Sequence, residues 1–145
     1  MPETCATESK STSLIAPDKS YIAYLPAVVL AVAIAVVSLI ERPQDLMDIH
    51  ASDKVLHGLM YALLALCAMA GAVVNRHSLW RDYISVVIVV TLYGALMEWM
   101  QYACTETRSG EWLDIVADLA GAAVGVVMVG LGECVWRKVT HTTSR

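Results

Sequence analysis

Three ionisable side chains stand at the start of the second long apolar segment of this 145-residue sequence. Asp53 and His57 are four positions apart and Lys54 and His57 are three apart, so all three share one face if the segment is helical. Tyr61 continues that face one turn further on. An ammonium, an imidazole and a carboxylate on one face can bind a charged group or carry out acid–base chemistry.

A second set of polar residues lies further along the chain. Glu98 and Gln101 are three apart near the end of one apolar segment, and Asp114 and Asp118 are four apart at the start of the next. Arg108 lies in the turn between the two segments, and arginine suits bidentate recognition of phosphate or carboxylate. Carboxylates within the hydrocarbon of a membrane are costly, so Glu98 and Asp118 indicate a functional site.

The polar residues are separated by four long apolar runs. The sequence is 57% apolar with a mean hydropathy of +0.58, which is too hydrophobic for a water-soluble domain of this size. A helix needs about 20 mostly apolar residues to cross a bilayer. We therefore predict an all-α integral membrane protein in which four transmembrane helices form an antiparallel bundle. The predicted helices are residues 21–40, 55–74, 83–103 and 113–136.

The predicted membrane domain covers residues 20–138. A Ser/Thr-rich arm, residues 1–19, is expected to be disordered and cytoplasmic, and residues 139–145 form a short cytoplasmic tail. The first apolar run is longer than that of a secretory signal, so we expect the helix to be retained.

The basic residues predict the orientation, because cytoplasmic loops are rich in lysine and arginine. One side of the membrane would hold seven of them, namely Lys10, Lys19, Arg76, Arg81, Arg137, Lys138 and Arg145. The other side would hold only Arg42, Lys54 and Arg108. Both termini are thus predicted to be cytoplasmic, with the polar residues near the outward face.

The helix pattern also predicts that these polar residues meet. At about 1.5 Å per residue, His57, Glu98 and Asp118 each lie roughly one to one and a half turns below the outer surface. Asp118 shares a stripe with Asp114, Gly121 and Gly125, and the two glycines favour close packing of helices in lipid. The stripe should therefore face the interior of the bundle.

A purely structural interpretation remains open for several of these residues. Lys54, Arg108 and Asp114 lie at helix ends, where charged side chains commonly reach water. Asp53 and Asp114 also suit helix N-termini through capping and the helix dipole. Taken alone, His57 is most simply a packing residue.

Other classes of site are not expected. The four cysteines, Cys5, Cys67, Cys104 and Cys134, are widely spaced and read as free thiols. His50, His57 and Glu98 show no metal-ligand spacing, so we expect neither a metal nor a cofactor. A net charge of -4 without a basic stripe argues against nucleic-acid binding.

Three segments resemble the VanZ-like family of small membrane proteins. They are DKVLHGLMYALLAL (residues 53–66), YGALMEWMQY (residues 93–102) and TRSGEWLDIVADLAGAAVG (residues 107–125). The family pattern is D-K-x-x-H, then E-x-x-Q, then an arginine and a short turn before D-x-x-x-N and glycines. Asp118 stands where the family often has asparagine. The resemblance implies a multi-pass protein of the bacterial cytoplasmic membrane, and the family's namesake is associated with teicoplanin resistance.

Three functions are consistent with the sequence. In the first, Lys54, His57 and Arg108 bind an anionic lipid headgroup or cell-envelope precursor while the acidic residues and Gln101 hold them in place, with a role in envelope maintenance or glycopeptide resistance. In the second, the protein is an enzyme in which His57 and Glu98 act as acid and base on a lipid-linked substrate. No nucleophile or phosphate-loop motif favours this enzyme. In the third, the chain is a structural or accessory subunit that binds a membrane-protein partner or a second copy of itself.

Overall fold

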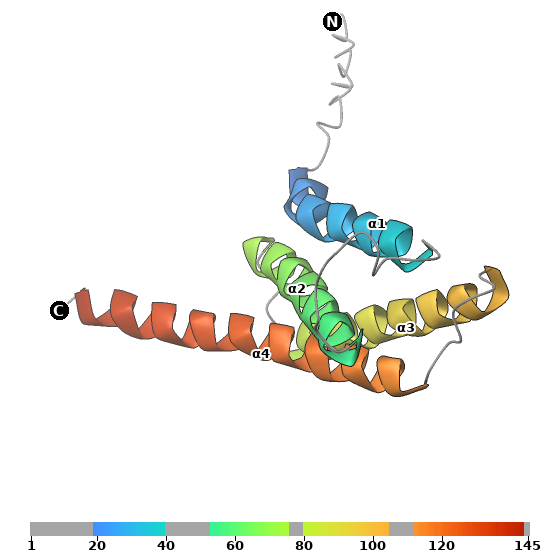
Figure 1. Ribbon diagram of the computed structural model, residues 1–145. Coiled ribbons are helices and arrows are strands. Elements are labelled where there is room, and N and C mark those ends of the chain that lie inside the picture. The colour runs from blue at the N-terminus through green and yellow to red at the C-terminus, as the bar shows by residue number, and fades with distance from the viewer. Residues whose placement is uncertain (1–18, 40–52, 76–79, 105–111, 144–145) are drawn as a thin grey trace, which may run out of the picture.

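The computed structural model describes residues 19–39, 53–75, 80–104 and 112–143, and in these ranges it is helical except for a turn at Asn75 (Figure 1). A short 3-10 helix, η1 (Lys19–Tyr24), leads into the first α-helix. The four α-helices are α1 (Leu25–Leu39), α2 (Asp53–Val74), α3 (Trp80–Cys104) and α4 (Trp112–Thr143).

Four helical segments are long and apolar enough to cross a membrane, which confirms the predicted all-helical class and the number of candidate spanning helices in the described residues. The segments are Tyr21–Leu39, Lys54–Val74, Trp80–Cys104 and Trp112–Thr140. The predicted arm, residues 1–19, lies outside the described residues except for Lys19, where η1 begins. The tail beyond residue 143 is also outside them.

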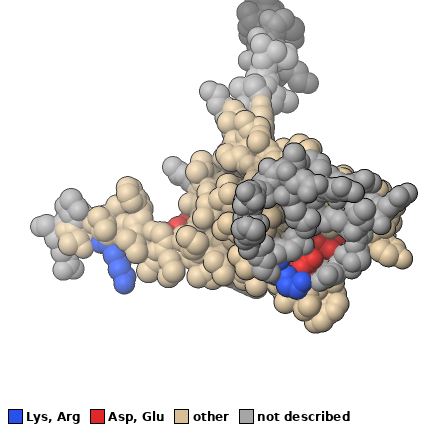
Figure 2. Space-filling model, viewed as in Figure 1, with Lys and Arg blue, Asp and Glu red and all other residues tan. Residues whose placement is uncertain are grey.

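The distribution of apolar side chains explains why these helices need a lipid environment. Large apolar residues on every helix point away from the bundle, for example Val29, Leu59, Leu92 and Val127, which are each about 60% exposed. In the view of Figure 2, uncharged surface covers nearly the whole described part of the molecule. Such a surface would be strongly unfavourable in water and is stabilised by contact with hydrocarbon chains.

Helix α2 is central, and its most extensive packing is against α4 (Figure 1). Gly121 and Gly125 of α4 lie directly on the backbone of α2. A Cβ atom at Gly121 would collide with the carbonyl of Gly58, and one at Gly125 would collide with that of Ala62. The glycine stripe therefore lets the two helices approach to backbone contact, which in lipid is a main source of helix association.

Helix α1 is held to the rest of the bundle partly by two side chains of α3. The Tyr93 hydroxyl donates a hydrogen bond to the backbone carbonyl of Ala31 at 2.6 Å, and the Gln101 amide donates one to that of Ser38 at 3.1 Å. Ser38 is in the last turn of α1, where carbonyls have no partner within the helix. Gln101 thus satisfies a buried polar group at a helix end.

Helix α4 extends well past the other helices at its C-terminal end, as Figure 1 shows. The prediction ended this helix at residue 136, whereas the structure continues it to Thr143. At about 1.5 Å per residue its 32 residues span roughly 48 Å, more than the hydrocarbon thickness of about 30 Å. A helix need not end at the membrane surface, because its polar last turns are stable in water.

Candidate functional site

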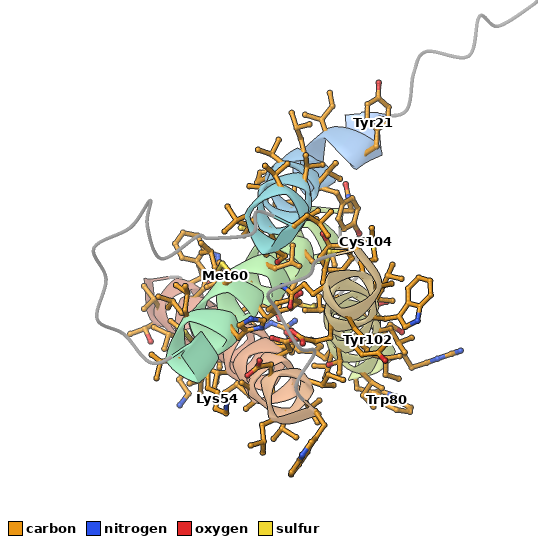
Figure 3. The ribbon with its side chains drawn as sticks, turned by 45° about the vertical axis from the view of Figure 1, so that its right-hand side comes forward. Tyr21, Lys54, Met60, Trp80, Tyr102 and Cys104 are labelled. Atoms are coloured by element: carbon orange, nitrogen blue, oxygen red, sulfur yellow. The ribbon has the colours of Figure 1, made fainter. Side chains whose placement is uncertain are left out.

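Five polar side chains from three helices meet near the N-terminal ends of α2 and α4 and the C-terminal end of α3. We call this group, formed by Lys54, His57, Glu98, Asp114 and Asp118, the polar cluster. His57 is 4% exposed, Glu98 4%, Asp114 5% and Asp118 0%, so four of the five members are buried. Figure 3 shows nitrogen and oxygen atoms gathered between these helices, away from the apolar outer faces.

The contact between His57 and Asp118 lies at the centre of the polar cluster. His57 Nδ1 is 3.1 Å from Asp118 Oδ1, and the two side chains are fully or almost fully enclosed. An ionised carboxylate can only accept a hydrogen bond, so when Asp118 is ionised Nδ1 carries the proton and donates it. The contact links α2 to α4 and fixes the orientation of the imidazole ring.

Helix α3 places a carboxylate next to this contact and, through a glycine, leaves room for it. Glu98 Oε1 lies 3.7 Å from His57 Nδ1, so one imidazole stands between carboxylates from two different helices. One turn earlier on α3, a Cβ atom at Gly94 would collide with the carboxylate of Asp118. Gly94 thus makes room for the buried aspartate.

The polar cluster reaches the surface through Lys54. Its ammonium lies 3.6 Å from Asp114 Oδ1, and the side chain of Lys54 is 42% exposed while that of Asp114 is 7% exposed. Figure 2 shows a small patch of basic and acidic surface beside the residues drawn in grey. Asp114 lies in the first turn of α4, where a negative charge is stabilised by the helix dipole.

Two tyrosines close the inner side of the polar cluster. The ring of Tyr61 stacks on His57 with 6.2 Å between ring centroids and an interplanar angle of 11°. Tyr93 lies 6.3 Å beyond Tyr61. The hydroxyl of Tyr61 is buried and has no hydrogen-bond partner among the described residues. The polar cluster therefore borders an aromatic layer on the side of the bundle core.

The structure brings together five of the eight residues singled out as binding residues. Lys54, His57, Glu98, Asp114 and Asp118 all belong to the polar cluster. Gln101 is also buried, but its amide is engaged by α1. Asp53 begins α2, although its side chain lies outside the described residues, and Arg108 is outside them altogether.

Sequence reasoning missed Gly94 and the polar partners of α1. Gly94 stands four positions before Glu98, so the two share a face of α3, and this spacing was the available signal. The bonds from Tyr93 and Gln101 end on backbone carbonyls, which every residue possesses. No sequence pattern marks such acceptors.

The composition of the polar cluster limits its chemistry. Three carboxylates stand with one ammonium and one imidazole, so negative charge is in excess. His57 can transfer a proton and Lys54 can contact an anion at the surface. Within the described parts of the chain, one group of side chains is close enough together to hold a metal ion: one nitrogen or oxygen atom from each of His57, Glu98 and Asp114 lies within 4.8 Å of the other two.

Comparisons of the chain with protein-family models, with curated proteins and with solved structures gave no match.

Proposed function

We propose that this chain is a multi-pass protein of the bacterial cytoplasmic membrane that binds an anionic headgroup, of a lipid or of a cell-envelope precursor, at the polar cluster. The observation that carries the proposal is the convergence of ionisable side chains from three apolar helices. Burying them is costly, and intramembrane ionisable residues commonly mark binding or transport sites. Their position at helix ends gives a headgroup access from one membrane surface.

Lys54 is the proposed point of first contact with the headgroup. Its ammonium is partly exposed while its partner Asp114 is buried, so the lysine can contact a ligand without leaving the aspartate. Arg108 precedes the first residue of α4, Trp112, by four positions in the sequence, and we assign it a second phosphate contact. The buried members would hold these cations in place and contact hydroxyl groups of the ligand.

Substitution of Lys54 tests the headgroup proposal. We expect Lys54→Gln to weaken retention of phosphatidylglycerol by about ten-fold, because one charge-assisted contact is lost. Native mass spectrometry of the purified chain, reconstituted with phosphatidylglycerol or phosphatidylcholine, gives the retention. Arg137→Gln is the matched control, since it removes a cation at the other end of α4. Equal retention by both variants would contradict the role of Lys54.

An enzymatic function is the second proposal, and the hydrogen bond between His57 and Asp118 favours it. A carboxylate at Nδ1 orients an imidazole and supports its use as a base through the other nitrogen. Glu98 would then be the acid that serves the leaving group. Turnover of phospholipid or undecaprenyl-type substrates by the wild type, lost in His57→Ala, would support this function. The absence of turnover in the wild type would count against it.

The VanZ-like resemblance adds envelope maintenance or glycopeptide resistance to the proposal. Five of the residues that carry the resemblance lie in the polar cluster, which supports a shared use of that site. Cells that express the chain should tolerate a teicoplanin-type agent better than cells that express Glu98→Gln at the same level. If the variant instead fails to accumulate in the membrane, the polar cluster serves the structural or accessory role.

A further inference from the structure

The ligand atoms at the centre of the polar cluster have the spacing of a metal site. His57, Glu98 and Asp114 each offer one nitrogen or oxygen atom, and the three atoms lie within 4.8 Å of one another. Metal–ligand bonds of about 2.0–2.6 Å join ligand atoms that are up to roughly 4–5 Å apart. The three residues come from α2, α3 and α4, so one ion would bridge three helices.

Unsatisfied buried atoms provide a second, independent observation. Asp114, one of the three proposed ligands, is 5% exposed, and its Oδ1 has no hydrogen-bond partner among the described residues. The Lys54 ammonium lies 3.6 Å from this oxygen, beyond hydrogen-bond distance. A buried carboxylate with an unused oxygen is unfavourable unless positive charge lies close by.

The charges of the polar cluster point the same way. Glu98, Asp114 and Asp118 contribute three carboxylates. Among the members of the polar cluster, only Lys54, at the surface, is a cation whether or not His57 is protonated. The interaction of Asp114 with Lys54 uses Oδ1 at 3.6 Å, and a carboxylate has enough lone pairs to bind a second cation. A divalent ion would balance the remaining negative charge.

The contact between His57 and Asp118 matches the usual surroundings of a metal-binding histidine. Such a histidine binds the ion through one ring nitrogen and donates the N–H of the other to a carboxylate, which fixes its orientation. Asp118 Oδ1 lies 3.1 Å from His57 Nδ1, in position to accept that hydrogen bond. Asp118 would thus be a positioning residue.

We propose that His57, Glu98 and Asp114 bind a divalent metal ion, and that Asp118 orients His57 for this purpose. One imidazole with two carboxylates suits Mn²⁺ or Zn²⁺. The site does not depend on the headgroup proposal. Sequence reasoning expected no metal because it looked for ligands at short spacing, whereas these ligands come from three separate helices.

Metal binding by the full-length chain in detergent provides the test. The protein is stripped with a chelator and titrated with Mn²⁺, and the loss of the free-ion signal in electron paramagnetic resonance measures binding. Mn²⁺ is the better first probe because it prefers oxygen and nitrogen ligands to the thiols of Cys104 and Cys134, which are exposed. We expect about one ion per chain. A wild-type chain that leaves Mn²⁺ free at about 100 μM, and that also fails to retain Zn²⁺ in dialysis, would overturn the proposal.

Variants locate the ion. We expect His57→Gln and Glu98→Gln each to weaken binding by about 10–100-fold, and Asp118→Asn by about ten-fold. Glu133→Gln is the control, because it removes a carboxylate from the far part of α4. Equal affinity in all four variants would place the ion elsewhere and overturn the assignment. Folding of each variant is judged by its elution in size-exclusion chromatography and by circular dichroism. If a variant does not fold, the wild-type stoichiometry and the Asp118→Asn affinity still test the metal-site proposal.

Discussion

Asp118 shows how one buried charge depends on its immediate neighbours. Its side chain is fully enclosed, and burying a carboxylate costs several kcal/mol unless other groups compensate. His57 supplies a hydrogen bond, and the missing side chain at Gly94 supplies space. A small change in that space should therefore have a large effect.

Substitution of Gly94 tests this dependence. In Gly94→Ala the new methyl group would occupy the position of the Asp118 carboxylate, which must move and lose its contact with His57. We expect the free energy of unfolding in detergent to fall by about 1–3 kcal/mol. Gly132→Ala is the matched control, because a Cβ atom there meets nothing within 4 Å. Equal stability of the two variants would show that the aspartate has more room than the structure indicates.

At the scale of residues, the sequence predicted the members of the polar cluster better than their surroundings. His57, Glu98 and Asp118 were found because helical spacing and depth place charges together. The space at Gly94 and the use of Gln101 by α1 depend on how the helices rotate and cross. These quantities are set by packing and are not visible in a single apolar run.

At the scale of helices, the pair formed by α2 and α4 is the structural basis of the polar cluster. Gly121 and Gly125 bring the two backbones together directly below Asp118. Any separation of these helices would also pull His57 away from Asp118. The stability of the pair and the geometry of the polar cluster are therefore coupled.

A methyl group at Gly121 should disrupt the contact between α2 and α4 and so test this coupling. It would meet backbone atoms of Gly58, which cannot rotate away as a side chain can. We expect Gly121→Ala to lower the free energy of unfolding in detergent by about 3 kcal/mol. Gly58→Ala provides a comparison on the opposing helix, since a Cβ atom there makes an ordinary 3.5 Å contact with Ala117. A larger loss of stability in Gly58→Ala than in Gly121→Ala would contradict this packing.

Sequence length and composition sufficed to predict the four helices but not all of their ends. Runs of about 20 apolar residues mark the hydrocarbon core, so the existence of each helix followed directly. The predicted end of α4 was placed where polar residues begin, near Arg137. The helix continues because its last residues still form backbone hydrogen bonds outside the apolar region.

At the scale of the whole molecule, two exposed cysteines report on its orientation in the membrane. Cys104 is exposed at the end of α3, close to the polar cluster, while Cys134 is exposed on α4. Cys134 is 22 residues after Trp112, which corresponds to about 33 Å of helix. The two thiols therefore lie toward opposite ends of the helical bundle.

Labelling of single-cysteine variants tests the proposed orientation, with both termini in the cytoplasm. We expect a membrane-impermeant maleimide to label the variant that retains only Cys104 in intact spheroplasts. The variant that retains only Cys134 should react only after permeabilisation. The reverse pattern would invert the orientation and place the polar cluster at the cytoplasmic surface.

The attachment of α1 has a consequence for how such a chain can diverge. Both hydrogen bonds from α3 to α1 end on main-chain carbonyls, at Ala31 and Ser38, so they require a helix but no particular side chains. The outward residues of α1 need only be apolar. Substitutions should therefore accumulate far faster in α1 than in α2, α3 and α4. Homologues of this chain would then share recognisable sequence similarity only in the residues that follow α1.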